Sequence, residues 1–552
     1  MERGAWSVAA TGAPRSPLHA PRSLFRWLWL ALAATTLAPP ADSQVPTWTR
    51  GATCYEIFVR SFYDSDGDGI GDLNGLTQKL DYVQRLGARC IWLMPVAESP
   101  SYHGYDVSDY YRVEKDYGTN DDFKRLVAAA HGRGIKVLVD MVLNHTSSEH
   151  PWFQAALRDT ASPYRAWYRW SQGGPGAPGP WAGSQPWHKS PVRDEWYYGL
   201  FWVGMPDLNY VRTPVLDEAK RIARFWMRDM GVDGFRLDAV PYLVEEPGRA
   251  QNSPGTHRVL HTYGDYVRSL GGYTVGEVFF PTDTLLSYYP DQLTGYFAFE
   301  IADSLIAGVR RGDARGVLAP ALRLQQAVRP AERFSPFLRN HDQPRTRTEL
   351  GGDVAKAKVA ALLLLTLPGL PYVYYGEEIG MLGAKPDPRI RTPMQWSASH
   401  AAGFTRGTPW ERLADDSLAM TVEAQERDSS SLLSLYRRLI HLRASDAALA
   451  SGTLAPLVAS DDAVAAYVRR AGDRVVLVVA NLDSTARRGV TLSAATGTLP
   501  PGRWAVRALL GNGPAAPLVV RADGSVQGYV PLDTLAPRAG VVLELVRATR
   551  RP

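Results

Sequence analysis

Four short apolar runs in this chain each end in a group of charged and amide side chains. The four segments are DMVLNHT at 140–146, GFRLDAV at 234–240, TVGEVFF at 274–280 and FLRNHDQ at 337–343. Short apolar runs of this kind are typical of buried strands. In a parallel (β/α) barrel, functional residues come from the C-terminal ends of several different strands. The pattern therefore indicates an α/β chain built on such a barrel.

Two of these strand ends carry acidic side chains suited to opposite roles. Arg236 and Asp238 project from the same face of an extended strand, so the guanidinium keeps the carboxylate ionised and oriented. Glu277 precedes the apolar residues 278–280, a setting that desolvates a carboxyl group and raises its pKa. Retaining glycoside hydrolysis needs one ionised and one protonated carboxyl group about 5 to 5.5 Å apart. The alternative for these two segments alone is a salt bridge inside the barrel and an unrelated strand-end glutamate.

Six motifs occur in an order that resembles the α-amylase family, glycoside hydrolase family 13. They are GYDV at 104–107, DMVLNH at 140–145, MPDLN at 205–209, GFRLDAV at 234–240, GEV at 276–278 and RNHD at 339–342. MPDLN is intermediate between the QPDLN of the oligo-1,6-glucosidase branch and the MPKLN of the neopullulanase branch. The resemblance covers nearly the whole chain after residue 41.

The resemblance implies roles for eight residues. Asp238 would be the nucleophile that forms a covalent glycosyl intermediate, Glu277 the acid and base, and Asp342 the third carboxylate, which stabilises the transition state. Residues implied in substrate binding are Tyr105, His103, His145, Arg236 and His341.

The length of 552 residues is too great for one core and suits a barrel with further domains. The resemblance implies a (β/α)8 TIM barrel at 47–145 and 206–448, with an inserted subdomain B at 146–205 after the third strand. That insertion is too long for a structureless loop. Short strands separated by Gly, Asp and Pro then predict a C-terminal antiparallel β-sandwich domain at 449–552. Predicted elements are strands at 55–60, 90–94, 135–139 and 371–375 and helices at 76–86 and 430–443.

The N-terminus predicts a secreted protein. Arginines precede an apolar run at 27–38, and small residues come after it, which is typical of a signal peptide at 1–41 and too short for a confident membrane span. A later translation start or a retained anchor are the alternatives. The segment holds four Arg and one Glu, so its removal brings the net charge of +5 closer to balance. The mature chain therefore gives no electrostatic case for nucleic acid and has no membrane span, and the resemblance implies an α-glucan as substrate; we expect a monomer.

The two cysteines begin the first two predicted strands. Cys54 and Cys90 would lie at the same end of neighbouring strands, where a disulfide is geometrically possible in an oxidising compartment. Two buried free thiols remain the alternative. No CxxC pair occurs, so zinc is not indicated.

The acidic loop, DSDGDGIGD at 64–72, resembles the calcium loop that comes after the first strand in one branch of the amylase family. Its acidic residues recur as in an EF-hand, but position 12 is Gly75 and a strand precedes the loop. Neighbouring carboxylates repel one another unless a cation lies between them, which favours a metal site. The alternative to a metal site is a solvated turn. In many amylases the asparagine that corresponds to Asn144 belongs to another calcium site. The remaining ligands of that site cannot be matched in this sequence. The predicted Ca²⁺ ligands are Asp64, Asp66, Asp68, Ile70 and Asp72.

Two features bear on which bond is cut. Exo-acting α-glucosidases of the family usually have an aspartate three residues before the motif tyrosine, and here that residue is Tyr102, followed by His103 as in endo-acting α-amylases. RTPMQW at 391–396 is instead typical of the glucosidase branch. We therefore predict a secreted, retaining α-amylase that cuts internal α-1,4 bonds of starch, glycogen or maltodextrins. The alternatives are an α-glucosidase, a neopullulanase-like hydrolase or a transglycosylase, and more remotely a non-catalytic transporter-accessory homologue.

Overall fold

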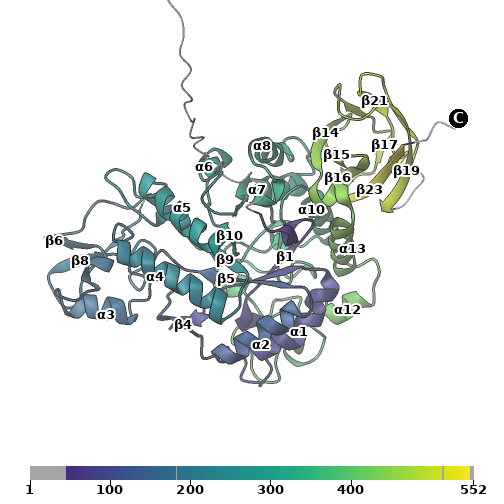
Figure 1. Ribbon diagram of the computed structural model, residues 1–552. Coiled ribbons are helices and arrows are strands. Elements are labelled where there is room, and N and C mark those ends of the chain that lie inside the picture. Colours follow the sequence, from purple (N-terminus) through teal and green to yellow (C-terminus); the bar gives the residue numbers. More distant parts are fainter. Residues whose placement is uncertain (1–44, 182, 512–514, 548–552) are drawn as a thin grey trace, which may run out of the picture. The chain divides into compact units, whose positions relative to one another are not determined.

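A barrel of eight parallel strands forms the centre of the chain. The computed structural model describes residues 45–181, 183–511 and 515–547, and the predicted signal peptide lies outside these residues (Figure 1). The strands are hydrogen-bonded in the order β12-β11-β10-β9-β5-β2-β1-β13. Tyr372 N of β13 donates at 2.9 Å to the carbonyl of Pro336, the residue after β12, and so closes the barrel. The predicted TIM barrel is confirmed. Its strands are β1 (Cys54–Ile57), β2 (Cys90–Leu93), β5 (Lys136–Met141), β9 (Gly234–Leu237), β10 (Tyr273–Gly276), β11 (Gly295–Phe297), β12 (Phe334–Ser335) and β13 (Tyr372–Tyr374).

Helices alternate with these strands along the chain. In Figure 1, helices such as α2, α4 and α5 lie around the central strands. Helix α10 is apolar on nearly all sides, because it is buried between the barrel and the C-terminal sheet. The main helices are α1 (Leu73–Leu86), α2 (Asn120–His131), α4 (Thr213–Arg224), α5 (Pro254–Ser269), α6 (Thr282–Leu286), α7 (Phe299–Arg311), α8 (Ala319–Ala327), α10 (Val354–Thr366) and α13 (Leu432–Ser445).

Two predicted boundaries differ from the structure for identifiable reasons. The strand predicted at 55–60 ends at Ile57, because the chain turns into a short 3-10 segment in which Ser61 donates to the Arg391 carbonyl at 2.5 Å. The helix predicted at 76–86 begins at Leu73, because the Asp72 side chain accepts a hydrogen bond from Gly75 N and caps it. The other predicted elements agree within two residues with β2, β5, β13 and α13.

A small subdomain is inserted between β5 and α4. It contains α3 (Pro151–Arg158) and an antiparallel sheet in the order β6-β8-β7, formed by Trp170–Gln172, Glu195–Tyr198 and Trp187–Lys189. Asn144, three residues after β5, connects this insertion to the barrel. Its side-chain amide donates to Asp207 Oδ2 at 3.0 Å, and its carbonyl accepts from Leu208 N at 2.8 Å. The insertion is thereby fixed next to the end of a barrel strand.

The C-terminal part is an antiparallel sheet of eight strands with its own hydrophobic core. The order is β20-β19-β23-β16-β15-β14-β18-β21, and the apolar side chains of its two ends, such as Leu518 and Val526, belong to one buried cluster. The sheet therefore folds over on itself, as in a sandwich. Its strands are β14 (Thr453–Ala459), β15 (Val464–Ala471), β16 (Arg474–Asn481), β18 (Leu492–Ala494), β19 (Gly502–Leu510), β20 (Leu518–Val520), β21 (Val526–Tyr529) and β23 (Ala539–Arg547).

Two buried arginines, one from α13 and one from this sheet, bind the end of α10. Arg443 of α13 donates to the carbonyls of Leu365 and Leu367, at 3.1 and 2.6 Å. Arg469 of β15 donates to the Thr366 carbonyl at 2.5 Å. Both guanidinium groups therefore satisfy carbonyls at the C-terminal end of α10, which the helix itself leaves without partners.

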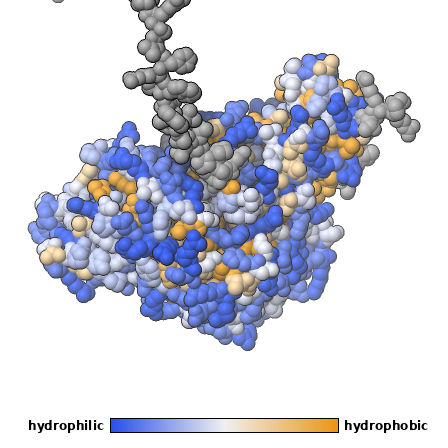
Figure 2. Space-filling view, in the orientation of Figure 1, coloured by the Kyte–Doolittle hydropathy of each residue, from blue (hydrophilic) through white to orange (hydrophobic). Residues whose placement is uncertain are grey.

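Cys54 and Cys90 form a disulfide between β1 and β2. The two residues are direct partners in the parallel register, and their Cα atoms lie 4.5 Å apart. The sequence allowed either a disulfide or two buried free thiols, and the structure contains the disulfide. In the described part of the chain, helices fall short of the length and hydrophobicity needed to cross a membrane. Figure 2 shows a mostly hydrophilic face with small, separate hydrophobic patches.

Candidate active site

Three predicted catalytic carboxyl groups line one cavity at the C-terminal ends of the barrel strands. Asp238 comes after β9, Glu277 comes after β10 and Asp342 lies on the segment after β12. The cavity has a volume of about 380 Å³. Its lining comprises His103, Tyr105, His145, Phe201, Met205, Asp238, Ala239, Pro241, Tyr242, Glu277, Phe279, Asp342, Asp387 and Arg391.

Arg236 lies beneath this cavity and binds three carboxyl groups. Its Nη1 donates to Asp238 Oδ1 at 2.7 Å and to Asp140 Oδ1 at 2.9 Å, and its Nη2 donates to Glu277 Oε2 at 2.6 Å. The contact with Asp238 is the one expected from their spacing along β9. Because Asp238 and Glu277 share one guanidinium, their carboxyl groups face the same part of the cavity.

The surroundings of Glu277 favour its protonated form. Burial raises the pKa of Glu277 to about 7, and the charges of Asp238 and Asp342 act in the same direction, against the opposing charge of Arg236. The side chain of Phe279, two residues later, lines the cavity. A carboxyl group in this state can donate a proton near neutral pH.

His341 connects the opposite wall of the cavity to the barrel interior. Its Nδ1 lies 2.5 Å from Glu56 Oε1, and its Nε2 lies 2.6 Å from the Tyr105 hydroxyl and 3.1 Å from Asp342 Oδ2. Burial lowers the pKa of His341, but the charges of Asp342 and Glu56 outweigh it and raise this pKa to about 10. An imidazolium donates from both ring nitrogens, and the Tyr105 hydroxyl in turn donates to Asp140 at 3.0 Å.

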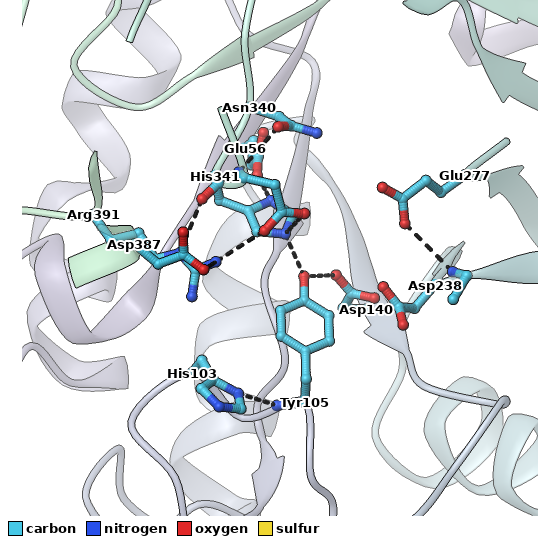
Figure 3. A network of polar contacts seen from close by, with 12 residues as sticks. Glu56, His103, Tyr105, Asp140, Asp238, Glu277, Asn340, His341, Asp387 and Arg391 are labelled. Atoms are coloured by element: carbon cyan, nitrogen blue, oxygen red, sulfur yellow. Dashed lines mark hydrogen bonds and ion pairs between the residues drawn. The ribbon is translucent and has the colours of Figure 1, made fainter. Parts of the chain in front are cut away.

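Asp342 is held as a carboxylate by two cations. Besides His341, Arg391 donates to Asp342 Oδ1 at 2.9 Å and to Asp387 Oδ2 at 3.3 Å. Burial alone would raise the pKa of Asp342, but the charges of His341 and Arg391 keep it well below its usual range. The cavity therefore has a protonated carboxyl group at one side and an ionised one at the other. Figure 3 shows Glu277 across the cluster from Arg391 and Asp387.

Two neutral histidines contact the cavity near Tyr105. His145 Nε2 lies 3.1 Å from the Tyr105 carbonyl. His103 Nδ1 accepts from Tyr105 N at 3.1 Å, as Figure 3 shows. Burial lowers the pKa of both histidines. All eight predicted site residues thus lie in one place: six line the cavity, while Arg236 and His341 lie buried beneath it.

Sequence reasoning assigned no role to four further members of this network. Glu56 lies within β1, Asp140 within β5, and Asp387 and Arg391 on the segment after β13. A signal was present for two of them, because a charged residue inside an apolar strand must have a buried partner. Arg391 begins RTPMQW, a motif that indicates a family branch and gives no sign of the contact with Asp342.

The acidic loop lies apart from the cavity and is shaped by its own backbone. Carboxylate oxygens of Asp64, Asp66 and Asp72 lie within 4.8 Å of one another, and Asp68 does not belong to this group. Gly69 has a φ of +97°, and a Cβ there would lie 1.9 Å from the Thr408 carbonyl oxygen. Only glycine fits this position. The Asn144 amide, by contrast, binds Asp207 as described above.

The loop carboxylates already accept hydrogen bonds from backbone donors. Asp64 accepts from Gly67 N at 2.6 Å and Gly69 N at 2.8 Å, and Asp72 accepts from Ser65 N at 2.7 Å. Both oxygens of Asp64 already accept two hydrogen bonds, Oδ1 from Asp66 N and Gly67 N and Oδ2 from Gly69 N and Thr405 Oγ1, whereas Asp72 Oδ2 accepts one. Oxygen ligands suit a hard cation such as Ca²⁺. Asp66 and Asp72 therefore have oxygens that suit a cation, whereas Asp64 would have to give up a hydrogen bond to join them, and the remaining ligands would come from backbone carbonyls or water.

Comparisons with known proteins agree with this geometry. The family model "Alpha amylase, catalytic domain" matches residues 56–452, which include every residue of the cavity. Alpha-amylase 3 of Dictyoglomus thermophilum is 38% identical over 442 residues, covering 79% of this chain and 85% of the relative. Trehalose synthase/amylase TreS of Mycolicibacterium smegmatis is 36% identical over 492 residues, covering 78% and 81%. The crystal structure of an alpha-amylase from H. orenii superposes with a TM-score of 0.77 and 38% identity, covering 89% of this chain and 99% of that one.

Proposed function

The chain belongs to the α-amylase family and is a glycoside hydrolase, and on that premise we propose that it cuts internal α-1,4 bonds of starch, glycogen or maltodextrins with retention of configuration. One observation carries this proposal: Asp238, Glu277 and Asp342 face a single cavity, with the pKa values of Glu277 and Asp342 shifted in opposite directions. Retaining hydrolysis requires a protonated acid beside a nucleophilic carboxylate, and Glu277 and Asp238, which share the guanidinium of Arg236, fit these two roles.

In the proposed first step, Asp238 attacks the anomeric carbon of the sugar. The bond to the leaving oxygen breaks, and Glu277 transfers its proton to that oxygen. In the second step, Glu277 takes a proton from water, which attacks the same carbon and releases Asp238. Arg236 contacts both Asp238 and Glu277, so it stabilises whichever carboxylate is formed.

Asp342 and its cations are proposed to bind the sugar ring that becomes positively charged. An oxocarbenium-like transition state is stabilised by a nearby carboxylate and by hydrogen bonds to its hydroxyl groups. His103 is proposed as a further donor to a sugar hydroxyl, His145 as an acceptor through Nδ1, and the Tyr105 ring as a face for the sugar to stack on. Each of these side chains lines the cavity.

Cleavage inside the chain rather than at its end is supported by Tyr102. Its ring stacks on Trp410, with centroids 5.3 Å apart, and its hydroxyl lies 3.4 Å from Arg391 Nη1. A neutral phenol at this position lacks the carboxylate that binds a chain end in related exo-acting enzymes. RTPMQW supports the alternatives, namely an α-glucosidase, a neopullulanase-like hydrolase or a transglycosylase.

Secretion and calcium binding complete the proposal. Secretion rests on the apolar run at 27–38, and N-terminal sequencing of the exported protein would test the cut near residue 41. Calcium binding rests on the grouping of Asp64, Asp66 and Asp72. The main experiment is chromatography of early products from amylose, maltotriose and pullulan. Internal cutting predicts a broad range of oligosaccharides from amylose, whereas glucose released alone from the first time point would contradict it.

A further inference from the structure

The position of the acid determines the direction of the substrate chain. Glu277 must reach the oxygen that joins the two sugars, so the sugar that leaves lies on its side of the cavity. Figure 3 shows Asp387 and Arg391 on the opposite side of the cluster. The wall that contacts the leaving sugar is therefore the one that continues from Glu277 toward the inserted subdomain.

Three aromatic side chains form this wall. Phe201 and Tyr242 line the cavity, and their ring centroids lie 5.6 Å apart in a perpendicular arrangement. Trp181 extends the wall outward, with its centroid 5.9 Å from Tyr242 and 6.2 Å from Phe201. Burial and the nearby charge of Glu277 raise the pKa of Tyr242 to about 12, which is consistent with a wall that begins beside the acid.

The outer part of the wall is exposed to solvent. Trp181 is 43% exposed and Phe201 is 42% exposed, although large aromatic side chains are usually buried. Exposed aromatic groups next to a cavity indicate a binding surface. Both faces of a glucose ring carry C–H groups that pack well against a flat aromatic ring. The chemistry of this wall thus suits a glucosyl unit.

We propose that Trp181 is a specificity-determining residue that binds the glucosyl unit on the leaving side of the cleaved bond, and later binds an acceptor sugar in the same place. This inference rests on the proposed function. In the second step, a hydroxyl group of the acceptor gives its proton to Glu277, its oxygen bonds to the anomeric carbon, and the bond to Asp238 breaks. Water and a sugar compete as acceptors. The fraction of enzyme with a sugar bound against Trp181 therefore sets the ratio of transfer to hydrolysis.

α-Maltosyl fluoride separates the two sides of the cavity, because its leaving group places no sugar against Trp181. The experiment compares kcat/KM for maltotetraose with kcat/KM for α-maltosyl fluoride, in the wild type and in Trp181→Ala. We expect the ratio of the two values to fall about five- to tenfold in the variant, the size of a lost stacking contact. Transfer to added maltose should fall by a similar factor.

Two further variants act as controls. Trp202 is 54% exposed in the same insertion but lies outside the three-ring wall, so Trp202→Ala should keep the wild-type ratio. Trp181→Phe retains an aromatic ring and should give an intermediate ratio, which decides the matter if Trp181→Ala unfolds. An unchanged ratio in Trp181→Ala, or an equal change in Trp202→Ala, would overturn the inference. A wild type that releases no fluoride would instead contradict the proposed function.

Discussion

The cavity and the acidic loop both gather carboxylates, but different partners hold them. In the cavity, Asp238 and Glu277 bind the guanidinium of Arg236. In the loop, Asp64 and Asp72 accept hydrogen bonds from backbone N–H groups. A side-chain cation adds a full charge to its surroundings, whereas backbone donors mainly fix geometry.

This difference in partners changes the pKa values of the carboxyl groups in the cavity and in the loop. One guanidinium cannot neutralise three buried carboxyl groups, so burial raises the pKa of Glu277 to about 7 and that of Asp140 to about 6. Burial also opposes ionisation of Asp64, but hydrogen bonds from Thr405 and from backbone N–H groups lower its pKa. The cavity thus retains a transferable proton, while the loop retains negative charge.

The largest effect is expected from Asp238→Asn. This change removes the nucleophile and keeps its shape, so kcat should fall about a thousandfold or more. The matched change in the loop, Asp64→Asn, should lower the melting temperature and leave kcat of the folded enzyme within about twofold, because the loop makes no contact with the sugar. Steady-state kinetics on maltotetraose measure kcat of both variants. Comparable losses of kcat in Asp238→Asn and Asp64→Asn would remove the distinction between the cavity and the loop.

The next effect is the dependence of activity on pH. Glu277 must be protonated to act as the acid, and its pKa is raised to about 7. Activity should therefore be retained below pH 7 and decline as pH rises through this value, approaching about tenfold per pH unit. A profile of kcat/KM between pH 5 and pH 10 measures it. Glu277→Gln should lose this alkaline decline together with most activity, and a decline that persists in that variant would assign it to another group.

Glu56→Gln should have an intermediate effect. Glu56 contacts no substrate, but its charge helps to raise the pKa of His341 to about 10. Without that charge the pKa of His341 falls, and kcat/KM should drop about tenfold with an additional pH dependence. The ring resonances of His341, followed by NMR against pH, test this role, and an unchanged titration would refute it.

Removal of calcium should have the smallest effect on catalysis and should act on stability. An ion that binds only the folded state stabilises it by about 2.7 kcal/mol at a hundredfold excess over its Kd. Excess chelator should therefore lower the melting temperature of the wild type by a few degrees, and added Ca²⁺ should restore it. Asp64→Asn should show no such response. If the wild type melts at the same temperature with and without chelator, the calcium proposal fails.

The barrel and its acidic residues were predictable because strand ends carry a local signature. Asp238 and Arg236 are two residues apart, so their contact is expected from strand geometry. Glu56 and His341 are 285 residues apart, and only the closed barrel brings them together. The boundary at Ile57 was missed for the same reason, since the bond from Ser61 to the distant Arg391 carbonyl decides it.

The aromatic wall was beyond sequence reasoning as well. Trp181 lies in a stretch rich in Gly and Pro, where periodicity gives no indication of orientation. Its neighbours Phe201 and Tyr242 come from the insertion and from the segment after β9, and their approach depends on how the insertion is fixed by Asn144. Contacts of this kind arise from tertiary structure alone.

Arg469, at the end of α10, makes the catalytic barrel depend on the C-terminal sheet. Shortening the enzyme to its barrel, by ending the chain before residue 449, would remove Arg469 and take from the Thr366 carbonyl its guanidinium donor. Arg443 would remain, but beside an α10 surface stripped of its apolar cover. Engineers who seek a minimal version of this hydrolase should therefore keep the sheet, or redesign the exposed side of α10 before removing it.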